Sequence, residues 1–208
     1  MPDKYILITV VVGSLETNCY LLADASSKQT FIIDPGDAPE RIIKRIEYKE
    51  LKPTAIINTH GHADHIIGNQ ALREVYKVPL YILAPDKDYL TDPALNYSLF
   101  AGTSAVSCAA DKLLNDGDVL EAGGLKVKVI ASPGHTPGGM LLLCEDLLFT
   151  GDTLFCGSAG RTDLPGGDDD ALMASLKMIR SMPKHLKILP GHGPACKLEE
   201  ELKHNPYL

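Results

Sequence analysis

Short runs of apolar, β-forming residues recur along the whole chain, separated by polar turns or by longer amphipathic segments. Apolar runs of four to eight residues are typical of strands, whereas apolar residues spaced three and four apart indicate helices. The pattern predicts strands at residues 5–12, 19–23, 30–33, 55–58, 80–83, 119–121, 126–131, 140–144, 147–150 and 187–189. It predicts helices at residues 39–50, 64–77, 93–100, 168–181 and 198–204.

The predicted strands outnumber the helices, and the two kinds of element are mixed along the chain. Several strands are joined by turns as short as Glu145 and Asp146. Such turns connect antiparallel neighbours, and helices between strands pack outside the sheets. We therefore expect an α/β (α+β) fold with antiparallel or mixed sheets. No repeat, low-complexity tract or linker divides the sequence, so residues 1–208 are expected to form a single domain.

Composition and charge exclude several classes of protein. Hydrophobic residues make up 45% of the chain and charged residues 23%, which is typical of a soluble globular protein. No apolar run approaches the roughly 18 residues of a membrane helix. The run YILITVVV follows Asp3 and Lys4 and lacks a small-residue cleavage site, so it indicates a strand and not a secretory signal. The net charge is -7 without a basic cluster, which disfavours nucleic acid and anionic membranes as partners.

Cysteine usage indicates a reducing compartment. The five cysteines are Cys19, Cys108, Cys144, Cys156 and Cys196. Their number is odd and none forms a CxxC pair, which favours free thiols. We therefore expect a cytoplasmic location, with Cys156 and Cys196 as buried or partly buried free thiols; whether either lies at a functional site stays open.

Polar clusters directly follow five of the predicted strands, and five of the seven histidines lie in them. The clusters read IIDPGD, THGHADH, SPGHTPG, TGDT and PGHGPA. Loops at strand ends are where a rigid scaffold holds reactive groups. In a helix, positions 60 and 62 would point about 200° apart, whereas an i, i+2 pair in a loop can converge on one ion. We therefore place His60 and His62 in a loop and Asp64 at the start of the next helix.

These clusters contain seven candidate metal ligands. They are His60, His62, Asp64, His65, His135, Asp152 and His192. Imidazoles and carboxylates without thiolates suit zinc, iron or manganese. The alternative is a polar cluster that binds nothing. His185 and His204 lie among lysines at predicted helix ends, and we expect both to be solvated.

The HxHxDH pattern resembles the signature of the metallo-β-lactamase superfamily, and His135, Asp152 and His192 match its later positions in the same order. The resemblance covers residues 34–192. It implies an αββα sandwich of two mixed β-sheets flanked by helices, with two divalent metal ions, zinc first and iron or manganese as alternatives. It also implies one metal on His60, His62 and His135, the other on Asp64, His65 and His192, and Asp152 between them. Asp64 and Asp152 are the expected catalytic residues.

Two further residues have alternative interpretations. Asp34 in IIDPG matches a family position beneath the metal loops, where its carboxylate would orient the ligands through hydrogen bonds. The alternative is a turn-forming aspartate before Pro35. Arg161 in GRTD is a candidate grip on a substrate carboxylate, or else it pairs with Asp163 and fixes its own loop.

The stretch TGDTLFCGSAGRTDLPGGD, with PGHGPA and the final NPYL, resembles the small glyoxalase II-like branch of the superfamily. This implies hydrolysis of S-2-hydroxyacylglutathione, typically S-lactoylglutathione, by a metal-bridging hydroxide. Two dications outweigh the charges of Asp64 and Asp152, which favours a small anionic thioester. A thiolate also leaves without a protein acid. Full-length glyoxalase II enzymes grip glutathione with a C-terminal helical domain that this sequence lacks, so the thiol carrier stays open.

Other functions would use the same candidate residues. GRTD also occurs in persulfide dioxygenases, which use one iron held by two histidines and an aspartate. A lactonase or another ester hydrolase would share the mechanism, and a metal-stabilised binding protein would have coordinatively closed metals. A β-lactamase and a nuclease are disfavoured by the lack of a secretory signal and of a basic surface. Residues 91–116 are either a lid or a packed connection, and a monomer and a homodimer are both open.

Overall fold

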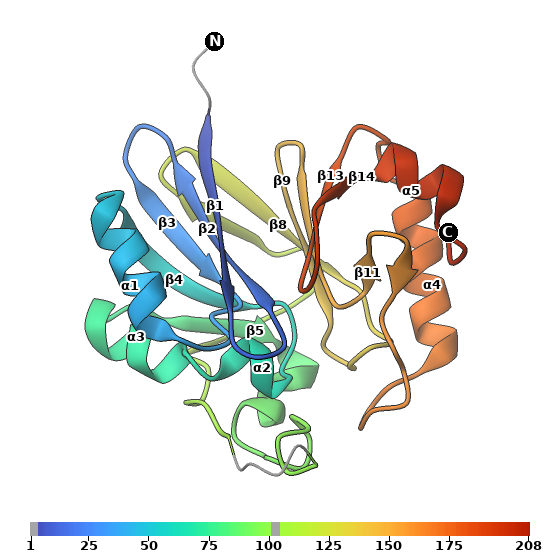
Figure 1. Ribbon diagram of the computed structural model, residues 1–208, viewed down its shortest axis with the longest axis horizontal. Helices are drawn as coiled ribbons and strands as arrows, with labels where there is room; N and C mark the ends of the chain where they lie inside the picture. Colours follow the sequence, from blue (N-terminus) through green and yellow to red (C-terminus); the bar gives the residue numbers. More distant parts are fainter. Residues whose placement is uncertain (1–3, 101–104) are drawn as a thin grey trace.

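Two six-stranded β-sheets lie face to face, with helices on the outer face of each (Figure 1). This computed structural model describes residues 4–100 and 105–208. The first sheet has the order β1-β2-β3-β4-β5-β6 and the second the order β14-β13-β10-β9-β8-β7. A short hairpin, β11 with β12, lies apart from both sheets. This is the αββα sandwich that the resemblance implied, and its sheets are mixed as expected.

The first sheet combines an antiparallel part with a parallel part. Its strands are β1 (Tyr5–Val12), β2 (Thr17–Asp24), β3 (Gln29–Ile33), β4 (Lys52–Asn58), β5 (Leu80–Leu83) and β6 (Lys112–Leu114). β1, β2 and β3 pair antiparallel, whereas β3 to β6 run parallel and are connected through helices. The carboxyl ends of β3 and β4 therefore meet at one edge of the sheet, which is where IIDPGD and THGHADH begin.

The second sheet is antiparallel except where β10 meets β13. Its strands are β7 (Val119–Ala122), β8 (Leu125–Ala131), β9 (Met140–Cys144), β10 (Leu147–Gly151), β13 (Lys187–Pro190) and β14 (Cys196–Lys197). β10 and β13 are parallel, so the loops that follow them leave from the same edge. The hairpin β11 (Leu154–Phe155) and β12 (Ser158–Ala159) follows β10 directly.

Helices cover the outside of both sheets. They are α1 (Pro39–Tyr48), α2 (Ala63–Ile66), α3 (Asn69–Tyr76), the 3-10 helix η1 (Ala84–Leu90), α4 (Asp169–Arg180) and α5 (Leu198–His204). In Figure 1, α1 and α3 lie on the side of the first sheet, and α4 and α5 on the side of the second. None of these helices combines the length and apolar character needed to span a membrane, within the described part of the chain.

Strand alternation divides the apolar residues between three core layers. In β2, Tyr20 and Leu22 face the space between the sheets, while Leu21 faces the helices of the first sheet. Ile42 of α1 packs in that outer layer, and Leu176 of α4 packs in the corresponding layer of the second sheet. Because both faces of the sheets are buried, the central strands are apolar almost throughout. This packing makes the sheet edges a rigid support for the loops.

Two predicted helices are wrong in detail. The helix predicted at 64–77 is divided into α2 and α3, because the chain turns at Ile67 and Gly68 to reach Pro35. The N–H of Gly68 donates to the Pro35 carbonyl oxygen at 2.8 Å, and a Cβ at Gly68 would lie 2.6 Å from that oxygen. Residues 93–100 form turns, and the helical segment of this region is η1, before them. The small-residue run at 101–110 lies partly outside the described residues.

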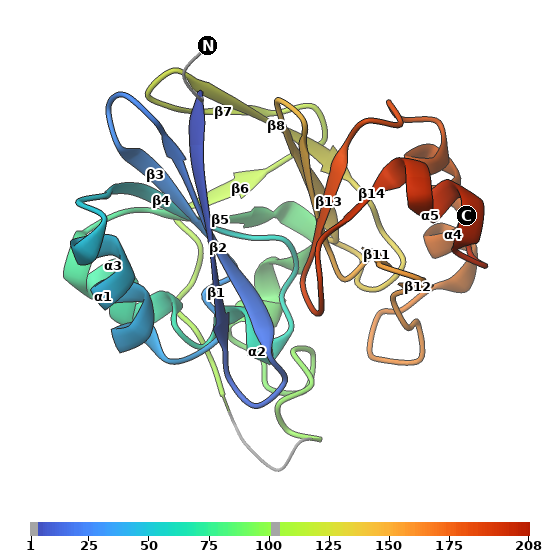
Figure 2. The ribbon, with the colours of Figure 1, turned by 45° about the horizontal axis from the view of Figure 1, so that its top comes forward.

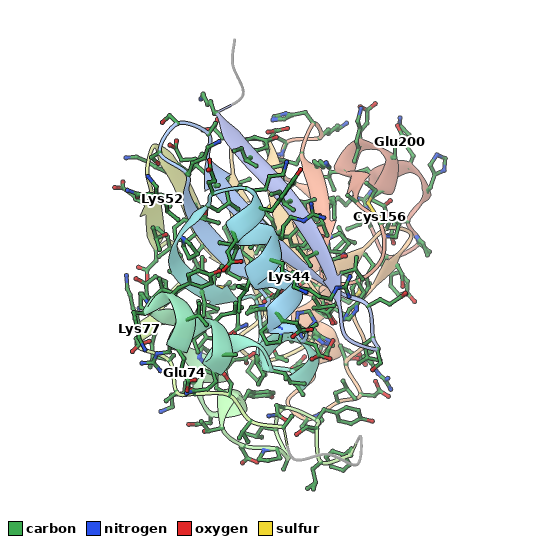
Figure 3. The ribbon with its side chains drawn as sticks, turned by 60° about the vertical axis from the view of Figure 1, so that its left-hand side comes forward. Lys44, Lys52, Glu74, Lys77, Cys156 and Glu200 are labelled. Atoms are coloured by element: carbon green, nitrogen blue, oxygen red, sulfur yellow. A yellow bond between two sulfur atoms is a disulfide. The ribbon has the colours of Figure 1, made fainter. Side chains whose placement is uncertain are left out.

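The prediction that all five cysteines are free is also wrong. Cys156 and Cys196 form a disulfide across 40 residues of sequence, marked in Figure 3 by the yellow bond at the Cys156 label. Cys196 is held in β14, and Cys156 lies in the turn between β11 and β12, so the bond attaches this hairpin to the second sheet. The other three cysteines are free thiols. Neither disulfide cysteine lines the cleft described below, although the ring centroid of the neighbouring Phe155 lies 6.2 Å from that of His192.

Candidate metal centre

All seven predicted ligands lie together at the edge where the loops after β4, β8, β10 and β13 meet. The tip of the β1–β2 hairpin and α2 border this edge (Figure 2). Their donor atoms form overlapping groups, each with its atoms within 4.8 Å of one another. The structure therefore brings together every residue that the sequence selected, although metal binding by these atoms stays a prediction.

The first donor set contains His60, His62 and His135. The first two follow β4, and His135 follows β8, so the set joins loops from both sheets. All three side chains are buried, and Nδ1 of His62 lies 2.9 Å from Nε2 of His135. Two imidazole nitrogens at this distance can share one proton or one cation. His60 and His62 lie before α2, as the loop prediction requires.

The second donor set contains Asp64, His65 and His192. Nε2 of His65 lies 3.4 Å from Oδ2 of Asp64 and 3.3 Å from Nε2 of His192. Nε2 of His192 lies 3.2 Å from the same carboxylate oxygen. Asp64 is in the first turn of α2, as predicted, and its Oδ2 also accepts a hydrogen bond of 2.9 Å from Thr17. One oxygen and two nitrogens thus converge on one point.

Asp152 connects the two donor sets. Its Oδ2 lies 3.6 Å from Nε2 of His135, in the first set, and 3.5 Å from Nε2 of His192, in the second. Its Oδ1 lies 3.5 Å from Nε2 of His65. A single carboxylate within reach of both sets is the arrangement that a shared ligand between two cations requires.

Backbone carbonyls determine which nitrogen of two ligands faces the centre. Nδ1 of His135 lies 2.7 Å from the carbonyl oxygen of Arg161, and Nδ1 of His192 lies 2.9 Å from that of Leu15. A carbonyl oxygen can only accept, so Nδ1 carries the proton in both rings. Nε2 is then left with its lone pair directed at the centre when the ring is neutral, which is how ligand histidines are usually oriented.

Asp34 lies beneath the loops, at the position that the family resemblance implied. It is buried, and its carboxylate accepts hydrogen bonds from the backbone N–H of Thr59 at 2.7 Å and from the Thr59 hydroxyl at 2.6 Å. Its Oδ2 also lies 3.2 Å from Nδ1 of His65. These contacts agree with the predicted role of orienting ligands. Asp34 has φ of 50°, a conformation that aspartate tolerates better than most residues.

Two glycines are required because the centre has no space for a side chain. A Cβ on Gly191 would lie 2.1 Å from Oδ1 of Asp152 and 2.7 Å from Cε1 of His65. A Cβ on Gly36 would lie 1.6 Å from the carbonyl oxygen of Asp64. The G in PGHG and the G in DPGD therefore allow the ligand loops to approach each other.

Two rings of the first donor set, those of His60 and His62, are neutral at physiological pH. Burial lowers the pKa of His60 well below its usual range, and neighbouring imidazoles lower it further. Burial and His135 lower the pKa of His62 to about 3. These rings therefore keep lone pairs available for a cation.

The two histidines of the second set tend to be protonated in the metal-free protein. Burial lowers the pKa of His65, but the carboxylates of Asp64 and Asp152 outweigh burial and raise it to about 9. Burial opposes the shift of His192 as well, yet hydrogen bonds to the same two carboxylates raise its pKa to about 11. In the metal-free protein, protons on these two rings supply the positive charge that balances the carboxylates of Asp64 and Asp152.

The residues present fit metal ions. Nε2 of His60 and Oδ1 of Asp152 are buried and have no hydrogen-bond partner among the described residues. Leaving such atoms unpaired costs about 1–3 kcal/mol each, more for a charged group. A cation between them would satisfy both, and the donor set of imidazoles and carboxylates suits zinc, iron or manganese.

The sequence did not identify Asp86, which lies directly behind the first donor set. This wholly buried residue of η1 accepts hydrogen bonds from the backbone N–H groups of Gly61 and Gly138. The segment APDKD has no pattern that distinguishes this carboxylate from other acidic residues. Only the fold, which places η1 behind both histidine loops, reveals the contact.

A cleft of about 420 Å³ opens over the centre. Its apolar lining includes Leu15, Ile67, Tyr97 and Leu164, and Arg161 is the one lysine or arginine among its described lining residues. The guanidinium of Arg161 pairs with the carboxylate of Asp163 through two hydrogen bonds, of 2.6 and 2.7 Å. This pairing is the alternative role considered for Arg161, and a substrate role stays untested.

The sequence model of the metallo-beta-lactamase superfamily matches residues 12–192. A probable metallo-hydrolase, YqgX of Bacillus subtilis, is 36% identical over 95% of this chain and 94% of its own length. The hydroxyacylglutathione hydrolase GloC of Haemophilus influenzae is 31% identical over 96% of both chains. The chain belongs to the metallo-beta-lactamase superfamily, whose members bind divalent metals, and these two relatives carry the names of hydrolases.

Two solved structures have the same fold. BLEG-1, described as a B3 metallo-beta-lactamase, has a TM-score of 0.94 and 36% identity, covering 98% of this chain and 99% of its own. TTHA1623 in a di-iron-bound form has a TM-score of 0.86 and 35% identity, covering 97% and 100%. The predicted fold class is thus confirmed. The two relatives have almost the same length as this chain but different names, and TTHA1623 is described with iron bound.

Proposed function

We propose that the chain is a metal-dependent hydrolase that cleaves small S-2-hydroxyacyl thioesters, with S-lactoylglutathione as the representative substrate. The observation that carries this proposal is the position of Asp152, whose carboxylate lies within 3.6 Å of imidazoles from both donor sets. A shared carboxylate suits two ions and not one. Similarity to GloC, named as a hydroxyacylglutathione hydrolase, supports the substrate class.

The seven residues would hold two divalent ions, zinc in the first instance. Bound there, the ions would activate a water molecule and stabilise the oxyanion that forms on the thioester carbonyl. Asp152 would hold the two donor sets at a fixed spacing, and Asp64 would complete the second set while Thr17 donates to its carboxylate. Both aspartates are therefore the proposed catalytic residues.

The cleft supports a thioester over an amide. Besides the predicted ligands, its described lining includes Asp37 and Tyr97, but neither a lysine nor a glutamate that would protonate a departing amine. A thiolate, from a thiol of pKa about 8 to 9, leaves without such an acid. The apolar lining near Leu15 and Tyr97 can contact the carbon chain of an acyl group or of a thiol carrier.

The test combines three measurements on one sample of purified protein: metal content, turnover of S-lactoylglutathione, and oxygen uptake. We expect about two metals per chain, release of free thiol, and no oxygen uptake. A matched pair of variants controls for a contaminating hydrolase. His135→Ala should abolish turnover, whereas His185→Ala, an exposed histidine outside the centre, should leave it unchanged. Turnover that survives His135→Ala would contradict the proposal.

An iron-dependent oxygenase is the second candidate. The segment GRTD resembles persulfide dioxygenases, and TTHA1623 is described with iron bound. One iron per chain, with oxygen consumed on glutathione persulfide and no thioester turnover, would favour it over the hydrolase. A β-lactam and a lactone belong in the same panel, because BLEG-1 is described as a β-lactamase and because esters share the hydrolytic mechanism.

A further inference from the structure

The carboxylate of Asp86 lies behind the first donor set and is not among the described residues that line the cleft. Its Oδ2 accepts hydrogen bonds from the N–H of Gly61 at 2.9 Å and from the hydroxyl of Thr136 at 2.7 Å. Its Oδ1 accepts one from the N–H of Gly138 at 2.5 Å. Three donors from two loops thus end on one side chain, which is 0% exposed.

The two loops come from different sheets. Gly61 lies between His60 and His62 in the loop after β4 of the first sheet, whereas Thr136 follows His135 in the loop after β8 of the second. Each donor on the loops is therefore next to, or within three residues of, a predicted ligand. The spacing of 2.9 Å between His62 and His135 depends on how these loops are held relative to each other.

Close packing of η1 against both loops gives independent support. A Cβ on Gly138 would lie 2.5 Å from the backbone nitrogen of Asp86, and a Cβ on Gly61 would lie 2.2 Å from Cβ of Tyr89. The hydroxyl of Tyr89 donates to the carbonyl of Pro165 at 2.8 Å, so η1 also contacts the loop that contains Arg161. A carboxylate that only capped η1 would not require the two loops to approach this helix so closely, and Gly61 and Gly138 permit that approach.

We propose that Asp86 is a positioning residue of the metal centre, which sets the spacing of His62 and His135 by holding both loops and thereby determines the affinity and geometry of the first metal site. It acts through the backbone of the loops and not on substrate. The proposal rests on the metal centre alone and holds whether the substrate is a thioester, a lactone or a persulfide.

An asparagine at position 86 keeps the shape but cannot satisfy all three donors. Its amide has one acceptor oxygen, so an NH₂ group must face either Gly138 or the pair of Gly61 and Thr136. At least one buried donor then loses its partner, and one loop must move. Asp24 provides a matched control, because it is a buried carboxylate that accepts several loop hydrogen bonds, from Ser26, Ser27 and Gly124, at the far end of β2.

The experiment measures cobalt binding to metal-free wild type, Asp86→Asn and Asp24→Asn, by titration and by visible absorption of the bound ion. We expect Asp86→Asn to weaken binding at the first site roughly 10- to 100-fold and to alter its spectrum. The second site should change less. Asp24→Asn should lower the melting temperature while leaving affinity and spectrum at wild-type values.

A lower melting temperature for Asp86→Asn with unchanged cobalt affinity and spectrum would overturn the proposal, because Asp86 would then stabilise the fold without affecting the metal site. If Asp86→Asn does not fold, Thr136→Val serves instead, since it removes one of the three donors and preserves side-chain shape. It should weaken cobalt binding at the first site by a smaller factor, and an unchanged site would again overturn the proposal. Because cobalt binding is measured without substrate, failure of the proposed hydrolase activity would not affect this result.

Discussion

The two donor sets differ in the protons that they hold before any metal binds. In the first set, burial keeps His62 neutral, with its pKa lowered to about 3. In the second, paired carboxylates hold protons on His65 and His192 to about pH 9 and about pH 11. A ligand must lose its proton to bind a metal, so His65 and His192 compete with protons for their ion, whereas His60 and His62 do not.

Metal binding near pH 7 should therefore release about two protons, both from the second set. His65 and His192 have pKa values above this pH in the metal-free protein, so each is protonated until the ion binds. Affinity at the second site should rise with pH to about 11, more steeply below about 9, where both rings must lose a proton. Binding by His60 and His62 at the first site should change little over this range. Calorimetric titration in buffers of different ionisation enthalpy measures the protons, and equal heats in all buffers would contradict the expectation.

Gly191→Ala should disrupt the centre by steric contact. The added Cβ would lie 2.1 Å from Oδ1 of Asp152, so the shared carboxylate must move away from at least one donor set. We expect the bound metal to fall from about two ions per chain toward one or none, measured by elemental analysis. Gly117→Ala is the control, because its backbone φ of 85° causes strain but no atom lies near the added carbon. A full metal complement in Gly191→Ala would show that the site relaxes.

Arg161→Ala should leave KM for S-lactoylglutathione within about twofold of wild type. Nε and Nη2 of the guanidinium already donate to the carboxylate of Asp163, so its charge is balanced within its own loop. Asp163→Ala is the complementary variant, since it frees the cation. An increase in KM of tenfold or more in Arg161→Ala would assign the arginine to the substrate after all.

At the scale of elements, the hairpin β11–β12 is small and depends on its attachments. Each strand has two residues, too few to be stable alone. The side chain of Asn205 donates to the carbonyls of Phe155 and Ser158, and the Cys156–Cys196 disulfide fixes the turn to β14. The hairpin begins two residues after Asp152, so these attachments also limit the movement of that ligand.

Removal of the disulfide should lower stability without changing the fold. Replacing Cys156 and Cys196 together by serine should decrease the free energy of unfolding by about 2 to 4 kcal/mol. The disulfide closes a loop of 40 residues, and without it the unfolded chain regains the conformational entropy of that loop. Denaturant unfolding measures this difference. In the presence of a reductant, the stability of the wild type should approach that of the double variant. If the two proteins are equally stable without reductant, the disulfide is not formed in solution.

Across the whole molecule, residues in regular patterns could be predicted and single contacts could not. The strands and the seven ligands followed from alternating apolar runs and from histidines in loops at strand ends. The layered sandwich required the resemblance, since periodicity does not show which sheet faces which. Asp86, the turn at Gly68 and the pairing of Cys156 with Cys196 depend on contacts between distant segments, for which one sequence has no signal.

The second donor set joins opposite regions of the sequence. His192 forms a bridge with Thr17, and the N–H of Asn18 donates to the carbonyl of Gly191 at 2.7 Å. A ribosome makes the chain from its amino terminus, so His60, His62 and His135 are all synthesised before His192. A nascent chain can possess the complete first set while the second still lacks a ligand. The second set therefore has all of its ligands only after synthesis has passed His192, so an ion that meets the chain earlier can find only the first set complete.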